Sequence, residues 1–119
     1  MAKLSTHVLD TARGRPAAGI GYILYRIDRS QGTEDHAELT SGVTNGDGRT
    51  DQPLLDGDVF RPGIYELLFD AGSYLRAQSP DEPPFFDWIT LRFTVSDATA
   101  SYHVPLLLSP WSYTTYRGT

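Results

Sequence analysis

The alternation of apolar and polar side chains predicts β-strands along most of the chain. The clearest example runs from residue 87 to residue 95, where apolar positions recur every two residues, as in a half-buried strand. One side of this segment carries Ile89, Leu91, Phe93 and Val95, and the other side carries Trp88, Thr90, Arg92 and Thr94. The same period predicts strands at residues 65–70, with Tyr65, Leu67 and Phe69 on one side, and at residues 22–29, with Ile23, Tyr25 and Ile27.

Two further strands are expected near the end of the chain, at residues 102–109 and 111–117, with Pro110 between them. Val104, Leu106 and Leu108 fall on one side of the first of these strands. If these three pack into the core, His103 must point away from it, because neighbouring side chains of a strand face opposite ways. Shorter or less regular patterns at residues 4–9 and 37–44 complete the expected strands.

A single helix is expected, at residues 70–79. Asp70 or Ser73 provides a cap for its start, and three prolines end it, at positions 80, 83 and 84. The Asn-Gly and Asp-Gly pairs within residues 44–49 are typical of tight turns. Several short strands with one short helix predict an all-β protein, an antiparallel two-sheet β-sandwich. A length of 119 residues fits a single domain that spans residues 1–119.

Charge and composition narrow the possible partners. The net charge of −5 argues against a nucleic-acid partner or an anionic membrane surface, which would both require a basic patch. No apolar run is long enough to span a bilayer, and no secretory signal is expected at the start. Without cysteine, the chain has no disulfides, no catalytic thiol and no thiolate ligand for a metal. This composition fits the cytoplasm.

Few residues are candidates for chemistry, and each has an ordinary alternative. His7 and His103 lie in expected strands, where a lone histidine is more often structural than functional. Arg49 follows two glycines in a turn, where an arginine is commonly solvated. His36 lies in an acidic, exposed segment. A metal held by the two strand histidines lacks a third ligand nearby in the sequence, so we predict neither a metal nor a cofactor.

Four segments together identify a family resemblance. Residues 4–17 (LSTHVLDTARGRPA) resemble the opening motif of the transthyretin-like 5-hydroxyisourate hydrolases, and residues 44–49 (TNGDGR) resemble their central loop. Residues 102–110 (YHVPLLLSP) and 113–119 (YTTYRGT) resemble their C-terminal signature. The final Tyr-Arg-Gly-Ser/Thr separates these hydrolases from transthyretin, a hormone carrier on the same fold. One departure is Trp111-Ser112, where the family more usually has Tyr-Gly.

The resemblance implies a transthyretin-like sandwich that assembles as a homotetramer, with sites in a channel between dimers. It implies hydrolysis of 5-hydroxyisourate to 2-oxo-4-hydroxy-4-carboxy-5-ureidoimidazoline in urate degradation, by attack of water on the lactam carbonyl. The implied catalytic residues are His7, Arg49 and His103. The implied substrate-binding residues are His7, Arg49, Tyr116, Arg117 and Thr119.

The expected chemistry suits these side chains. A neutral histidine serves as a base near neutral pH, and arginine stabilises negative charge that develops on a carbonyl oxygen. The sequence leaves open which histidine is the base. Two other classes of function also remain open at this point, a small-molecule carrier without turnover and a purely structural sandwich module.

Overall fold

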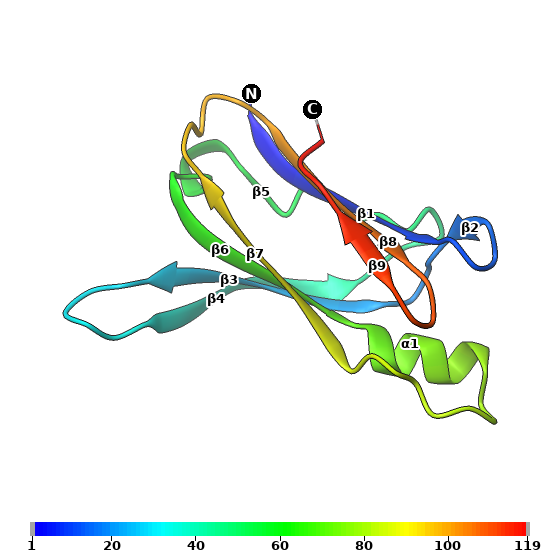
Figure 1. Cartoon of the computed structure of the whole chain (residues 1–119). Helices are drawn as coiled ribbons and strands as arrows, with labels where there is room; N and C mark the ends of the chain where they lie inside the picture. Colours follow the sequence, from blue (N-terminus) through cyan, green and yellow to red (C-terminus); the bar gives the residue numbers. More distant parts are fainter. Residues whose placement is uncertain (1, 119) are drawn as a thin grey trace.

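The computed structural model describes residues 2–118, which form two stacked β-sheets and one helix (Figure 1). Sheet A has the strand order β2-β1-β8-β9, and β5 pairs with the first two residues of β1, Lys3 and Leu4. Sheet B has the order β4-β3-β6-β7. The strands of sheet A are β1 (Lys3–Asp10), β2 (Arg15–Pro16), β5 (Leu55–Asp56), β8 (Tyr102–Leu108) and β9 (Tyr113–Thr115). Those of sheet B are β3 (Gly21–Asp28), β4 (Asp35–Val43), β6 (Gly63–Asp70) and β7 (Trp88–Val95). A short 3-10 helix, η1, covers Gly57–Val59.

The all-β sandwich prediction is confirmed, and the pairing adds one detail. The strand pairs are antiparallel except for β1 and β8, which run parallel and join the two ends of the chain. Their register pairs Leu4 with Tyr102 and Asp10 with Leu108. Figure 1 shows both chain ends at the same edge of the molecule. Residues almost a hundred positions apart therefore become neighbours in the centre of sheet A.

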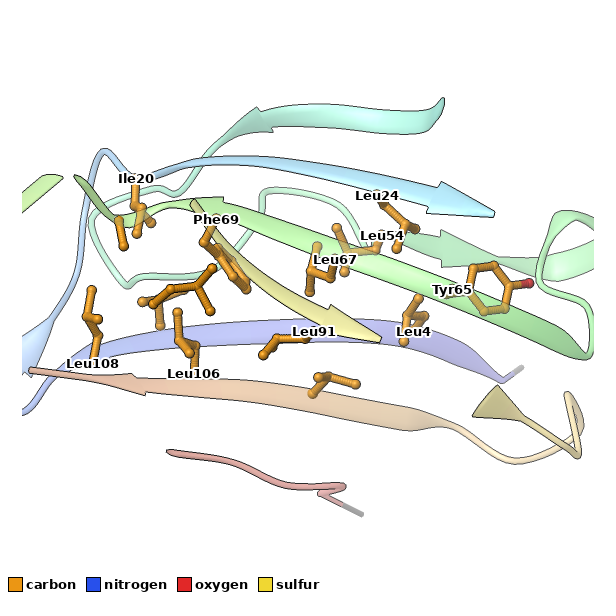
Figure 2. Packing of buried hydrophobic residues seen from close by; sticks show 14 of the residues in the cluster. Leu4, Ile20, Leu24, Leu54, Tyr65, Leu67, Phe69, Leu91, Leu106 and Leu108 are labelled. Atoms are coloured by element: carbon orange, nitrogen blue, oxygen red, sulfur yellow. The ribbon is translucent and has the colours of Figure 1, made fainter. Parts of the chain in front are cut away.

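The core lies between the sheets (Figure 2) and includes most of the apolar positions expected from the alternation on β6, β7 and β8. From sheet B these are Tyr65, Leu67, Phe69, Ile89, Leu91 and Val95, and from β8 they are Val104, Leu106 and Leu108, while Phe93 is only partly buried. Leu4 and Val8 of β1, where no alternation was predicted, are buried with them. Leu106 and Leu108 are fully buried, so the opposite side of β8, which carries His103, faces away from the core.

The strand predicted at residues 22–29 is confirmed as β3, and Ile27 is buried, but the set Ile23, Tyr25 and Ile27 does not mark the side of β3 that faces the core. In β3 the residues opposite the core positions of β6 are Tyr22, Leu24 and Arg26, and Leu24 is fully buried. The pattern misled because Arg26 occupies a core-facing position. Its guanidinium lies over the ring of Tyr65 and donates a 3.0 Å hydrogen bond to the Tyr65 hydroxyl, which satisfies the charged group at the end of the sandwich.

The helix prediction is confirmed at Ala71–Gln78, named α1. Asp70 is the N-cap residue and accepts a 3.1 Å hydrogen bond from the backbone N–H of Ser73, which satisfies one free donor of the first turn. In the part of the chain that the structure describes, no helix is long and apolar enough to cross a membrane. The last strand, β9, is shorter than the predicted 111–117, because regular pairing with β8 covers only three residues.

Candidate functional site

The two strand histidines lie on the same outer face of sheet A. The parallel register places Ser5 opposite His103 and His7 opposite Pro105. Residues of β1 are alternately buried and half-exposed, and Thr6 is among the buried ones, so Ser5 and His7 turn outward together. His7 and His103 are therefore diagonal neighbours across the β1–β8 pair, on the surface that faces away from sheet B.

His103 is held from three sides. The Nδ1 atom of its ring lies 2.9 Å from the hydroxyl oxygen of Ser5. Its backbone carbonyl accepts a 2.6 Å hydrogen bond from the N–H of Gly118, so the tail of the chain passes beside the ring. A Cβ at position 118 would lie only 3.0 Å from Cδ2 of the imidazole, so the glycine lets the tail approach the ring closely.

A tight turn at residues 45–49 carries Arg49, and Asn45 organises it. The Oδ1 atom of Asn45 accepts hydrogen bonds from the backbone N–H groups of Asp47, at 2.9 Å, and Arg49, at 3.1 Å. The Nδ2 atom donates to a carboxylate oxygen of Asp51 at 3.0 Å. The Asn-Gly and Asp-Gly signals in the sequence thus mark a closed turn with a fixed internal network.

The same turn docks on β1 through Gly48. The carbonyl of Gly48 accepts a 2.8 Å hydrogen bond from the N–H of Val8. Gly48 has a φ of +73°, and a Cβ there would lie 2.3 Å from the carbonyl oxygen of Val8. Glycine is thus required both by the backbone conformation and by the close approach. The residue after it, Arg49, is thereby held near β1, within electrostatic range of His103.

The electrostatics of the face keep its central histidine neutral. Burial, followed by the positive charge of Arg49 and then by His7, lowers the pKa of His103 below its ordinary value. A neutral imidazole has one nitrogen with a free lone pair. The ring of His103 is therefore in the form that accepts a proton, with an exposed guanidinium within electrostatic range.

The tail places its side chains on two different faces. The β8–β9 register continues to an isolated bridge between His103 and Gly118. Arg117 thereby falls on the core-facing side, where its guanidinium carbon lies 4.0 Å from the ring centroid of Tyr102. The Cβ position of Gly118 meets the ring of His103 on the opposite side. Tyr116 is 56% exposed and lines the same groove beside β7 as Arg117. Thr119 lies outside the described residues.

The structure thus brings His7 and His103 onto one face with Arg49 within electrostatic range, and it turns the guanidinium of Arg117 away. Tyr116 lines the groove beside β7 with Arg117. Sequence reasoning missed Ser5, whose signal was its position two residues before His7 on the same side of β1. His36 lies in β4 of the other sheet, 3.7 Å from a carboxylate oxygen of Glu66. Among residues 2–118 no group of three or more histidine or acidic side chains is arranged to hold a metal.

The fold is a two-sheet β-sandwich of the transthyretin type. Two histidines lie on one outer face, with an arginine within electrostatic range of one of them. Comparisons with known proteins identify the family. The chain belongs to the HIUase/Transthyretin family, whose model matches residues 4–118. It is 51% identical to the 5-hydroxyisourate hydrolase of Pseudomonas aeruginosa over 121 aligned residues, which cover 99% of this chain and 92% of that protein.

Two solved structures have closely similar folds. A crystal structure of (S)-allantoin synthase superimposes with a TM-score of 0.87 and 40% identity, and the match covers 99% of this chain but only 44% of that longer chain. Transthyretin from Sparus aurata superimposes with a TM-score of 0.87 and 26% identity, covering 99% of this chain and 97% of that one. The chain is thus more similar in sequence to the Pseudomonas hydrolase than to the Sparus transthyretin.

Proposed function

We propose that this protein hydrolyses 5-hydroxyisourate in urate degradation. The observation that carries the proposal is the grouping of His7, His103 and Arg49 on the outer face of sheet A. The name of the Pseudomonas relative, at 51% identity, supports the same substrate. The 26% identity to transthyretin makes a carrier without turnover the weaker alternative.

The proposed reaction needs a base for water and a sink for charge on the lactam carbonyl oxygen. A neutral His103 accepts a proton from the attacking water, in keeping with its lowered pKa. Arg49 binds the urate-like oxygens and stabilises the negative charge that develops as the carbonyl is attacked. His7 orients the substrate beside the water. Collapse of the tetrahedral intermediate breaks the C–N bond, and the ring nitrogen leaves with the proton that His103 took from water.

The product we propose is 2-oxo-4-hydroxy-4-carboxy-5-ureidoimidazoline, the carboxylate that ring opening yields. Tyr116 and Thr119 form the tail part of the substrate site in this proposal. Arg117 belongs to the proposed substrate-binding set only if its guanidinium leaves the ring of Tyr102, where it now lies. Replacing Arg117 by glutamine tests this point, because the loss of a direct contact with substrate would raise KM.

We further propose that the protein acts as a homotetramer in the cytoplasm. Two features support assembly: β7 and β9 end their sheets, and a groove of about 390 Å³ runs between them. Exposed strand edges are suited to pairing with a further copy. Light scattering tests the assembly, and a monomer with full activity would contradict it. Cell fractionation tests the location.

An absorbance assay tests the activity directly. Urate oxidase generates 5-hydroxyisourate from urate, and its decay is followed with and without this protein. We expect the intact protein to accelerate decay, and alanine at His7, Arg49 or His103 to slow turnover by about a hundredfold or more. His36→Ala, on the opposite sheet, serves as the matched histidine control. A protein that binds the substrate without faster decay would support the carrier instead.

A further inference from the structure

We propose that Ser5 positions His103, accepting a hydrogen bond from Nδ1–H of the ring and leaving Nε2 as the proton acceptor of the site. Ser5 is then a positioning residue that acts through the histidine and does not touch the substrate. The inference rests on the proposed function in one respect, the assignment of His103 as the base. It names the nitrogen that acts and the residue that selects it.

The fold places the Ser5 hydroxyl beside the ring of His103. Ser5 and His103 are directly opposite in the parallel register, although they are 98 positions apart in sequence. The Oγ–Nδ1 distance of 2.9 Å is that of a well-formed hydrogen bond. The contact is partly buried, which shields it from competing water. It occupies one ring nitrogen, so Nε2 is left to meet a ligand on the outer face.

The position of the hydrogen on the neutral ring of His103 decides which nitrogen can act as the base. In a neutral imidazole one nitrogen carries hydrogen and the other accepts, and the partner of one nitrogen decides the role of the other. A serine hydroxyl can act in either sense. Only the form with hydrogen on Nδ1 leaves a lone pair on Nε2 for the attacking water. The base role therefore requires Ser5 to accept the hydrogen bond.

Two other groups influence the pKa of the ring. Arg49 approaches from the 45–49 turn and His7 lies on β1, and both favour the neutral ring. Gly118 packs against the ring without charge. None of these contacts replaces Ser5 as the partner of Nδ1, so removing the hydroxyl isolates its effect.

The experiment compares the intact protein with Ser5→Ala, Ser5→Thr and the control Ser41→Ala, which removes an exposed strand serine from β4 in the other sheet. Nitrogen-15 NMR of the histidine rings reports which nitrogen of His103 carries hydrogen. Decay of 5-hydroxyisourate gives kcat and KM between pH 5 and 8. Ser5→Thr keeps a hydroxyl and suits a strand.

We expect hydrogen on Nδ1 in the intact protein. Ser5→Ala should lower kcat by about tenfold, the effect of one lost hydrogen bond, with little change in KM. Ser5→Thr should recover most of the rate, and Ser41→Ala should match the intact protein. Because an acceptor at Nδ1 favours the charged ring, Ser5→Ala should also move the acid limb of the rate profile to lower pH.

Two results would overturn the inference. One is hydrogen on Nε2 in the intact protein, a measurement that needs no substitution. The other is an acid limb that moves to higher pH in Ser5→Ala, which would mean that Ser5 donates to Nδ1. If the intact protein does not accelerate decay at all, the proposed function fails. The NMR spectra then still decide, on their own, how Ser5 and His103 share the proton.

Discussion

Replacing Gly48 by alanine should lower the melting temperature and displace the turn that carries Arg49 from its place against β1. The new Cβ would lie 2.3 Å from the carbonyl oxygen of Val8 and 3.1 Å from Cβ of Pro16. Both neighbours belong to the β1–β2 part of sheet A, which cannot move without disturbing β1. The methyl group therefore either strains the sheet or lifts the turn away from it.

Two costs add at this position. An alanine at the φ of +73° costs about 1–2 kcal/mol relative to glycine. Overpacking against backbone adds about 1–3 kcal/mol. The total of roughly 2–5 kcal/mol is a large share of the stability of an ordinary domain. For a chain of this size it corresponds to a fall in melting temperature of roughly 8–20 °C.

Two other glycines provide matched controls. Gly46 lies in the same turn, has no positive φ, and has nothing within 4 Å of its Cβ position, so Gly46→Ala should melt within about 2 °C of the parent. Gly14 has a φ of +68° and open space around it. Gly14→Ala therefore isolates the backbone cost and should lower the melting temperature by roughly 4–8 °C.

Thermal melting and the 5-hydroxyisourate assay should be run on all three variants. In the folded Gly48→Ala protein we expect kcat/KM to fall by at least about tenfold, because displacement of the turn moves Arg49 away from the histidines. If Gly48→Ala has the same melting temperature as Gly46→Ala, the close contact between Gly48 and Val8 is refuted. One that melts lower but keeps full activity would show that the turn does not position Arg49 for the reaction.

Three more predictions follow from other contacts. Gly118→Ala should lower kcat/KM by about tenfold with almost unchanged melting, because its Cβ would press on the ring of His103 at 3.0 Å; unchanged kinetics would contradict the contact. The pKa of His103 is lower in the folded protein than in the unfolded chain, so the free energy of unfolding should fall as pH drops below about 6.5. Urea titrations at each pH measure this fall, and it should be smaller in His103→Gln. Tyr74→Phe should cost about 1–3 kcal/mol in urea unfolding, because the Tyr74 hydroxyl donates a buried 2.7 Å hydrogen bond to Asp10; a variant as stable as the parent would show that the bond contributes nothing.

The alternation of apolar and polar residues predicted the buried side of a strand correctly where each core-facing position holds an apolar side chain. Ile89 and Leu91 on β7, like Leu106 on β8, are buried as the two-residue period required. The rule failed at β3 because Arg26 satisfies its charge on a tyrosine hydroxyl at a core-facing position. No local pattern encodes such a partner, which lies 39 positions away at Tyr65.

The candidate site was predictable as a set of residues but not as an arrangement. Parity showed that His103 would point away from the core, and the family resemblance supplied His7 and Arg49. That β1 and β8 pair in parallel, with Ser5 opposite His103, depends on how the sheets close over the whole chain. The direction of Arg117 could not be read either, because it follows the ring of Tyr102 on the core-facing side.

The parallel pairing of β1 with β8 has a consequence for how the protein is made. Contacts between distant segments form slowly, because a long loop must close before they stabilise anything. While the chain emerges from the ribosome, each paired residue of β1 appears 98 positions ahead of its partner in β8. An incomplete chain therefore holds His7 without His103 and exposes an unpaired strand edge that other chains can join. During refolding, activity should return with the slowest folding phase, in which β1 pairs with β8.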